Sequence, residues 1–178
     1  YKTSDDEIKA NPDLNLLNWI NAEYQLFRVI ENDRYNGLIK VPFTTVEQLV
    51  SCANTILNRR KSRAGKSLEH HLAVMFDKFS LLYDTQVVTE DNKRPDFIFP
   101  GSAFYHDKEF NSDRLIFLAS KTTCKDRWRQ ILNEADRIKD KYLFTLQQGI
   151  SGNQLSEMYK SNVKLVVPQP YVKSFPED

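Results

Sequence analysis

Two carboxylates and one lysine occur along the chain in an order that suits the hydrolysis of a phosphodiester bond. Asp96 opens a short apolar run, Lys121 ends the next one, and Glu134 follows on a predicted helix. That reaction needs a divalent cation held by carboxylates, an activated water and positive charge beside the phosphate. Neighbouring strands would bring Asp96 and Lys121 to one end of a sheet, with Glu134 pointing back towards them. The three residues are therefore a candidate metal-plus-lysine centre.

Each of the three residues also has a structural explanation. The pair Pro95-Asp96 is a common start of a turn or strand, and a lysine at the end of a strand is usually solvated. Taken singly, such residues are more often structural than catalytic. Their order on the expected elements favours chemistry, but spacing alone leaves both interpretations open.

Apolar spacing predicts helices in the first half of the chain and mostly strands in the second. The three early helices have Asp13, Thr45 and Ser67 as expected N-caps and cover residues 14–31, 46–60 and 68–83. Short β-rich runs follow at 85–89, 96–99, 115–121, 142–146 and 163–167. Two more helices are expected at 125–138 and 154–161. From residue 68 the order α-β-β-β-α-β predicts an α/β fold with a mixed sheet flanked by helices.

Length and composition suggest one domain over residues 1–178. Hydrophobic residues make up 40% and charged residues 28%, which is typical of a globular protein. We expect a loose lead-in at 1–12, helices and a basic loop at 13–66, and the core at 67–168. Because the chain begins at Tyr1 rather than Met, we expect it to be part of something longer.

Several classes of protein are disfavoured by the sequence. No apolar run approaches the roughly 18–20 residues needed to cross a bilayer, and no basic-plus-apolar leader begins the chain. Two cysteines, Cys52 and Cys124, make neither a disulfide framework nor a metal cluster. We therefore expect a reduced intracellular protein without a membrane partner.

Basic residues are clustered although the net charge is only +1. Five of the eight residues from 59 to 66 are basic, and we expect them to contact DNA phosphates: Arg59, Arg60, Lys61, Arg63 and Lys66. The alternative is the charged end of a helix.

A second basic cluster opens the helix predicted after Lys121. Lysine and arginine donate to guanine, and a carboxylate accepts from the cytosine amino group, so Lys125-Asp126-Arg127 can read consecutive G·C pairs. An ordinary solvated first turn is the alternative, although two bases there oppose the helix dipole.

Several motifs resemble a known family of nucleases. Pro95-Asp96, Lys121 and Glu134 look like the rearranged PD-(D/E)xK signature, in which the acid two residues before the lysine is missing, here at Ala119. More closely, the chain is similar to the C-terminal catalytic domain of the EcoRII restriction endonuclease family from Trp19 to Pro168. The motifs that carry this resemblance are RRKSRAGKSLE at 59–69, RPDFIFPG at 94–101 and KTTCKDRWRQ at 121–130.

The resemblance implies a restriction-endonuclease-like core, Mg2+ as cofactor and double-stranded DNA as partner. It also implies a homodimer that cuts CCWGG-like sites before the first cytosine and flips the central bases, in the cytoplasm of a prokaryotic cell. Asp96 and Glu134 would bind the metal, and Lys121 would orient the attacking water. Glu69 would be an additional acid, although a first-turn glutamate suited to the helix dipole is equally plausible. Tyr105 is a further catalytic candidate, with loop surface as the alternative.

Two other functions remain open. A repair or junction-resolving nuclease could use the same core, and a non-catalytic DNA-binding module could have kept the fold. Flipped bases need aromatic or arginine side chains around them. Trp19, Tyr24 and Arg28 are candidates, although core packing explains the two aromatics at least as well.

Overall fold

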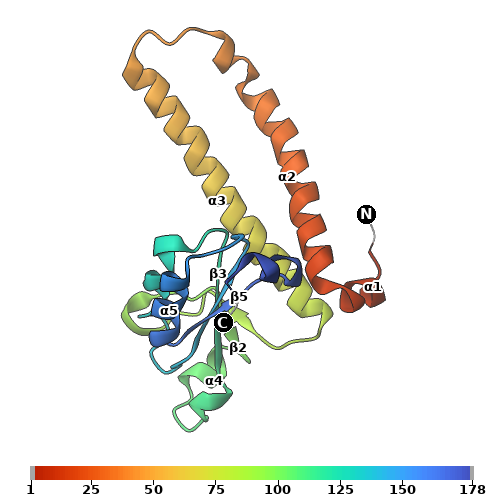
Figure 1. Cartoon of the computed structure of the whole chain (residues 1–178), viewed down its shortest axis with the longest axis vertical. Helices are drawn as coiled ribbons and strands as arrows, with labels where there is room; N and C mark the ends of the chain where they lie inside the picture. Colours follow the sequence, from red (N-terminus) through yellow and green to blue (C-terminus); the bar gives the residue numbers. More distant parts are fainter. Residues whose placement is uncertain (1–2, 177–178) are drawn as a thin grey trace.

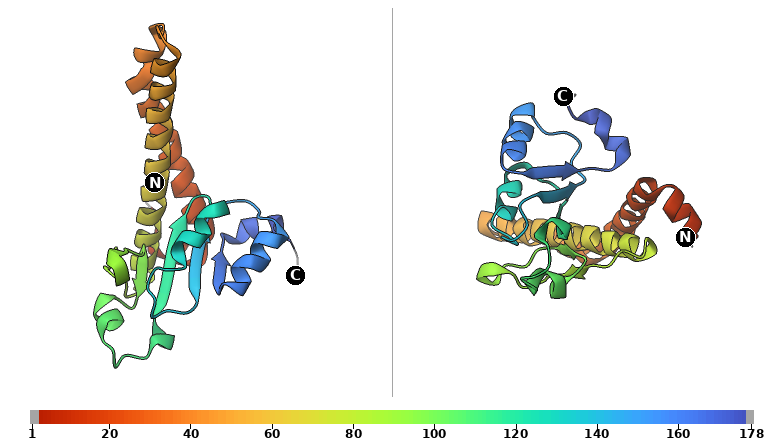
Figure 2. Two further views of the ribbon diagram at one scale, coloured as in Figure 1. Left: turned by 90° about the vertical axis from the view of Figure 1, so that its left-hand side faces the viewer. Right: turned by 90° about the horizontal axis from the view of Figure 1, so that it is seen from below.

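A long helical hairpin rises from an α/β body in the computed structural model, which describes residues 3–176 (Figure 1). The hairpin, called the arm below, consists of α2 (Pro12–Asn36) and α3 (Val46–Lys78) joined by a short connection that includes the 3-10 turn η1 (Leu38–Lys40). Seen from the side, the arm is narrow and extends well beyond the body (Figure 2). No helix in the described part of the chain is long and apolar enough to cross a membrane.

The second half of the arm is one continuous helix, so the prediction of two helices separated by a basic loop is wrong. Thr45 is the N-cap as expected, with its hydroxyl 3.2 Å from the backbone nitrogen of Gln48. The predicted cap Ser67 lies inside α3 and donates instead to Glu23 of α2. Arginine, lysine and alanine have high helix propensity, which lets the helix continue through residues 59–66. The basic residues are therefore displayed along a helix.

The start of the chain is also more ordered than predicted. Residues 5–10 form α1 (Asp5–Ala10), capped by the side chain of Ser4, where we expected a loose lead-in. Ile8 is buried against the bases of α2 and α3, together with Leu16 and Leu72. Polar contacts also hold α1, since Asn15 donates to the carbonyl of Glu7 and Lys78 pairs with Asp5.

The body contains a five-stranded mixed sheet, which confirms the predicted fold class. The strands lie in chain order and are β1 (Asp84–Thr85), β2 (Phe97–Phe99), β3 (Ile116–Lys121), β4 (Lys141–Thr145) and β5 (Val163–Val166). Strand β2 pairs antiparallel with both β1 and β3, whereas β3, β4 and β5 run parallel to one another. The short helices α4 (Ser102–His106) and α5 (Gly152–Lys160) complete the body.

Alternate residues of the strands enter two separate cores. Phe97 and Phe144 pack with the lower part of the arm, against Leu68 and Met75. Ile98, Phe117 and Leu143 face the other side, where Trp128 and Ile131 cover them. Because side chains alternate across a strand, each core uses every second residue.

The helix predicted over residues 125–138 is only partly present. The 3-10 helix η4 (Lys125–Ile131) occupies its first half, and turns follow. Trp128, Ile131, Ala135 and Ile138 are all buried, so the apolar pattern was interpreted correctly. Ala135 has a φ of +52°, a left-handed conformation that an α-helix does not allow. The helix therefore ends before Glu134.

Candidate active site

Asp96 and Lys121 form an ion pair where β2 begins and β3 ends. The side-chain nitrogen of Lys121 lies 3.0 Å from Oδ2 of Asp96. The same oxygen accepts a bond of 2.7 Å from the backbone nitrogen of Ser120 and one of 3.3 Å from its hydroxyl. The antiparallel register, which pairs Phe97 with Leu118, brings these residues together. Asp96 is only 8% exposed, so its carboxylate is held rigidly in the sheet.

Glu134 lies on the turn that follows η4. The side chain is partly buried, and burial raises the pKa of its carboxyl above the ordinary value. The positive charge of Lys121 opposes that rise, whereas the negative charge of Asp96 adds to it. Glu134 therefore lies within electrostatic reach of both residues.

Glu69 reaches the same place from α3. Burial raises the pKa of its carboxyl, and the charge of Asp96 raises it further, while Lys121 and Lys66 lower it. A cleft of about 240 Å³ lies between α3 and the end of β3. Glu69 and Lys121 both line it, together with Lys61, Ser62, Gly65, Lys66, Ser120, Thr122 and Arg127.

The donor atoms around Lys121 suit a divalent cation that also binds substrate. Within residues 3–176, no three histidine, cysteine or acidic side chains lie close enough to hold a metal by themselves. Mg2+ is commonly bound by one or two carboxylates, with water and phosphate oxygens as the other ligands. Asp96 and Glu134 are the two carboxylates expected in this role from the sequence, and the charge of Asp96 raises the pKa of Glu134.

The basic residues of α3 divide into two groups that the sequence did not distinguish. Arg60 makes two bonds of 2.7 Å to Glu31, and Arg63 pairs with Glu23. The guanidinium of Arg59 lies 5.7 Å from the ring of Tyr35. Arg60 and Arg63 therefore have ion-pair partners on α2, so fewer basic residues than expected are free to bind DNA phosphates. Nη1 of Arg59 is buried and has no hydrogen-bond partner among the residues that the structure describes. The other two, Lys61 and Lys66, line the cleft.

The segment after Lys121 is held by a residue that the sequence analysis missed. Gln147, just after β4, accepts bonds of 3.0 Å and 3.3 Å from the backbone nitrogens of Cys124 and Lys125. Its amide is an ordinary polar side chain in the sequence, so nothing marked it. Lys125 and Arg127 are exposed, and Arg127 lies at the cleft. The side chain of Asp126 lies outside the part that the structure describes.

Tyr105 is not at the cleft, where we expected it. It is only 2% exposed, and its hydroxyl donates to both carboxylate oxygens of Glu90, at 2.8 Å and 2.7 Å. Its neighbours are in the core that contains Trp128 and Ala135. An aromatic residue in a core of this kind is inaccessible to a large substrate.

Comparison with known proteins identifies relatives of the chain. The family described as EcoRII C terminal matches residues 27–178. The chain is 50% identical over 168 residues to the type II restriction enzyme EcoRII of Escherichia coli. This alignment covers 94% of the chain and 42% of that enzyme. It is 28% identical over 117 residues to the type II restriction enzyme SsoII of Shigella sonnei, covering 60% of the chain and 37% of SsoII. The chain thus spans less than half the length of these curated relatives.

Solved structures share the fold. Metal-depleted Ecl18kI in complex with uncleaved, modified DNA has a TM-score of 0.77 at 18% identity, covering 97% of this chain and 65% of that one. A complex of the restriction endonuclease PspGI with substrate DNA has a TM-score of 0.71 at 16% identity. The match covers 88% of this chain and 64% of that one.

Proposed function

Because the chain belongs to the EcoRII C-terminal family, we propose that it is the catalytic domain of a type II restriction endonuclease. The observation that supports this most directly is the ion pair of Asp96 and Lys121, with Glu134 and Glu69 in electrostatic reach. Residues 67–168, which begin inside α3, would be the nuclease core, so the lower part of the arm would belong to it. Its relatives come from bacteria, so we propose the prokaryotic cytoplasm as its place of action.

Cleavage would depend on Mg2+ held by Asp96 and Glu134. Such a cation, when bound, supplies charge stabilisation at the phosphate and lowers the pKa of a bound water. Lys121, fixed by Asp96, would donate a hydrogen bond to the attacking water and neutralise charge on the phosphate. Glu69, with a raised pKa, accepts a proton more readily than an ordinary glutamate and would help to orient that water.

Recognition of a CCWGG-like site would use the residues just after Lys121. Lys125 and Arg127 are exposed at the start of η4, and both side-chain types donate to guanine in the major groove. Asp126 would accept from a cytosine amino group. Arg127 lies at the same cleft as Lys121, so reading and cutting would take place on adjacent nucleotides.

Flipping of the central bases would involve Trp19 of α2. Its ring lies 6.0 Å from that of His71 of α3, beside a cavity of about 660 Å³. Extruded bases are held by stacking on aromatic side chains. Of the other two candidates, Tyr24 lies beside Arg63 and Arg28 bonds to Glu31. The three residues thus differ in their access to a base.

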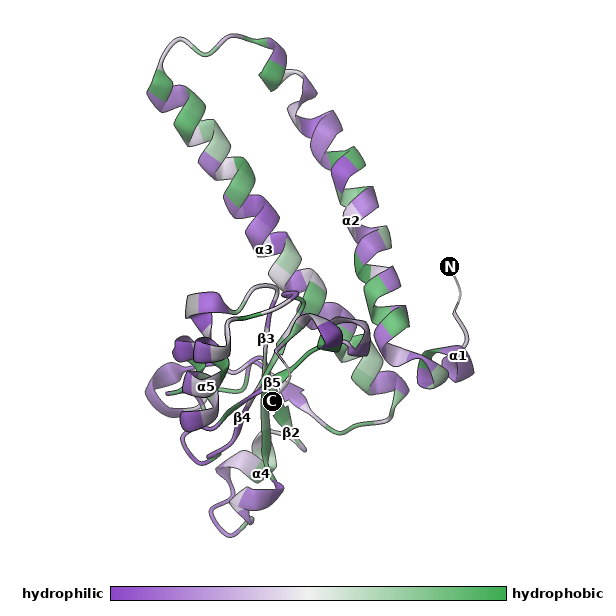
Figure 3. Cartoon of the chain, viewed as in Figure 1, coloured by the Kyte–Doolittle hydropathy of each residue, from purple (hydrophilic) through white to green (hydrophobic). Residues whose placement is uncertain are grey.

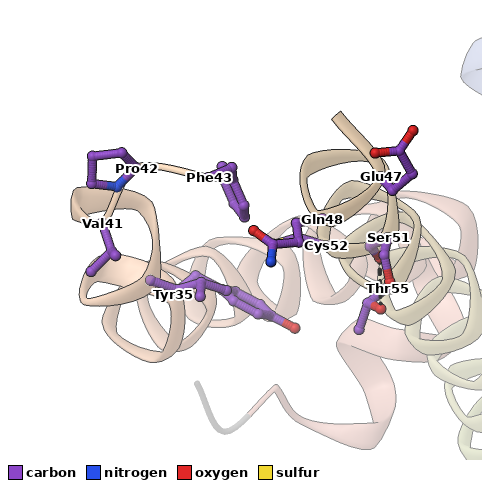
Figure 4. Close-up of a pocket in the computed structure, with 10 residues that line it drawn as sticks. Tyr35, Val41, Pro42, Phe43, Glu47, Gln48, Ser51, Cys52 and Thr55 are labelled. Carbon is purple, nitrogen blue, oxygen red and sulfur yellow. Dashed lines mark hydrogen bonds between the residues drawn. The ribbon is translucent and has the colours of Figure 1, made fainter. Parts of the chain in front are cut away.

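The arm would join two copies of the chain. A palindromic site requires two symmetry-related active sites, hence a homodimer. Hydrophobic residues recur along both helices of the arm (Figure 3). Exposed apolar side chains among them include Leu26, Val29, Ile30, Leu49 and Val50. At its end, Tyr35, Val41, Pro42 and Phe43 surround a pocket of about 650 Å³ (Figure 4). Exposed apolar surface of this extent is typical of interaction sites.

Digestion of plasmid DNA tests the proposed function. We expect fragments of discrete size with Mg2+, no cleavage with EDTA, and cut ends that map to one CCWGG-like sequence. Lys121→Ala should abolish cleavage but not DNA binding, whereas Lys160→Ala, on the exposed end of α5, should cut normally. Cleavage by Lys121→Ala at the same sites and at the wild-type rate would refute the assignment.

The same assay separates the two alternative functions. Preference for branched or mismatched DNA over every linear sequence would indicate a repair or junction-resolving nuclease. Specific binding without cleavage in either Mg2+ or Mn2+ would indicate a DNA-binding module.

A further inference from the structure

The turn that carries Glu134 is held by side chains from distant parts of the chain. Lys141, the first residue of β4, donates from Nζ to the carbonyl oxygens of Glu134 and Ala135, the second at 2.6 Å. Lys93 donates to the carbonyl of Asn133 at 2.9 Å. Glu90 accepts from the backbone nitrogen of Asp136 at 3.1 Å. Residues 133–136 therefore have three anchors outside their own segment.

Lys141 is the buried member of these anchors. It is only 4% exposed, and its amino group lies 5.0 Å from the centre of the Phe117 ring. Burial lowers the pKa of Lys141 to about 8, although the charges of Asp136, Glu90 and Glu134 act in the opposite direction. Burying an ammonium group is unfavourable unless its donors are used. Here the ammonium group donates to two main-chain carbonyls, and that of Ala135 also accepts from the backbone nitrogen of Ile138 at 2.9 Å.

The position of Lys141 in the sheet makes its bonds to the carbonyls of Glu134 and Ala135 rigid. In the parallel register of β3 and β4, Lys141 lies opposite Phe117, four residues before Lys121 on the same strand. Its backbone nitrogen bonds to the carbonyl of Asn162 at 2.9 Å. The strand that ends in Lys121 is thus paired with the residue that holds the Glu134 turn. The distance between Lys121 and Glu134 depends on that pairing.

We propose that Lys141 is a positioning residue that holds the turn carrying Glu134, and with it the orientation of the Glu134 carboxylate, an inference that rests on the proposed nuclease function. Without these two bonds, nothing in the local sequence favours the left-handed conformation of Ala135, which L-residues with a side chain rarely adopt. The turn would relax, and Glu134 would lose its orientation towards the metal. Groups that orient metal ligands through hydrogen bonds have this kind of effect.

The test is Lys141→Met, which keeps the length of the side chain and removes its donors. One readout is the rate of single-turnover cleavage in saturating Mg2+. The other, independent of cleavage, is the gain in affinity for a cognate duplex caused by Ca2+, measured by fluorescence anisotropy. We expect each to fall by about 10–100-fold, as for other groups that orient metal ligands.

Met158→Ala is the matched control for stability. Met158 is buried in the same core as Ala135 but on α5, away from the cleft, so its truncation lowers stability without touching the turn. We expect both readouts to be normal for this variant below its melting temperature. Normal readouts for folded Lys141→Met would overturn the proposal.

Two further variants keep the test decisive. Glu134→Ala must be inactive; if it cuts normally, the assignment of the active site fails, and this result is distinct from a failure of Lys141 alone. If Lys141→Met does not fold, Lys93→Ala replaces it, because Lys93 holds the same turn from its outer side. A severalfold loss in both readouts is then expected, and wild-type behaviour of Lys93→Ala would reject the proposal.

Discussion

Lys121 and Asp96 face each other across two antiparallel strands, with the lysine nitrogen 3.0 Å from Oδ2 of the aspartate. These two residues are far apart in sequence, and they meet because each lies at the end of one of two paired strands. The backbone nitrogen of Ser120 binds the same oxygen more closely, at 2.7 Å. The position of the carboxylate is therefore determined mainly by the sheet, while the lysine depends on the carboxylate.

This geometry predicts different effects for two neighbouring substitutions. Lys121→Met should lower the cleavage rate by about 10^2–10^3-fold, because it removes a donor that acts on the developing charge. Ser120→Ala should change the rate by only about threefold, since the backbone bond to Asp96 remains. Single-turnover kinetics on a short duplex would measure both. Equal losses would show that the Ser120 hydroxyl contributes to the rate as much as the Lys121 charge does.

The two groups of basic residues on α3 are expected to contribute differently to the salt dependence of DNA affinity. Lys61→Ala combined with Lys66→Ala should reduce the slope of log affinity against log salt by about 2, since each phosphate contact contributes about 0.9. Arg60→Ala should leave the slope unchanged, because Arg60 is paired with Glu31. Anisotropy titrations in Ca2+ at several salt concentrations would test this. A slope that fell equally for Arg60→Ala would mean that the ion pair opens on DNA.

The ion pair between the two arm helices predicts a pH-dependent stability. The Arg60 guanidinium, by its hydrogen bonds, holds the pKa of Glu31 below its ordinary value. A carboxylate with a lowered pKa in the folded state stabilises the protein above its unfolded pKa, and this contribution is lost as pH falls. Glu31→Gln should therefore lower the urea midpoint at pH 7, and the difference from wild type should shrink below about pH 4.5. A difference independent of pH would exclude a contribution from this charge.

Tyr105→Phe should cut DNA at nearly the wild-type rate. The substitution removes only a hydroxyl that is bonded to Glu90 inside the core. We expect a loss of stability of about 1 kcal/mol, typical of a single hydrogen bond, and at most a severalfold slower cleavage through the Glu90 contact with the 133–136 turn. Thermal denaturation and cleavage kinetics measure the two effects. A loss above 100-fold with normal stability would restore a catalytic role for Tyr105.

Exposed leucines test the proposed role of the arm. Leu26→Glu and Leu49→Glu should each give monomers, because a buried unpaired charge is unfavourable at an interface. Leu82→Glu is the control, since Leu82 is 72% exposed but lies after α3, off the arm. Sedimentation velocity gives the oligomeric state. Dimers that persist with both arm variants would place the interface elsewhere.

Local sequence was sufficient for most of the sheet and for the Asp96–Lys121 pair. Strands β2 to β5 lie within a residue or two of the predicted runs, because short apolar segments between turn residues have few other uses. Strand β1 (Asp84–Thr85) shares only Thr85 with the run predicted at 85–89, so the rest of that run is not a strand. Because the ends of β2 and β3 were predicted closely, the meeting of Asp96 and Lys121 could be predicted too.

The surroundings of Glu134 could not be predicted in the same way. An apolar repeat over residues 128–138 indicates which side chains are buried, but it does not distinguish an α-helix from a 3-10 helix followed by turns. The choice depends on Lys141, Lys93 and Glu90, whose bonds to this segment are made only when the chain is folded. Periodicity contains no information about such partners.

The sequence by itself determined the mixed sheet, the residue types of the candidate centre and the resemblance to a nuclease family. Tertiary structure alone decided that α3 is continuous, that Arg60 and Arg63 pair with α2, and that Glu134 lies on a turn. The physical reason is the range of the interactions. Propensity and hydrophobic pattern act over a few residues, whereas the ion pairs and main-chain bonds that orient the centre join residues that only folding brings together.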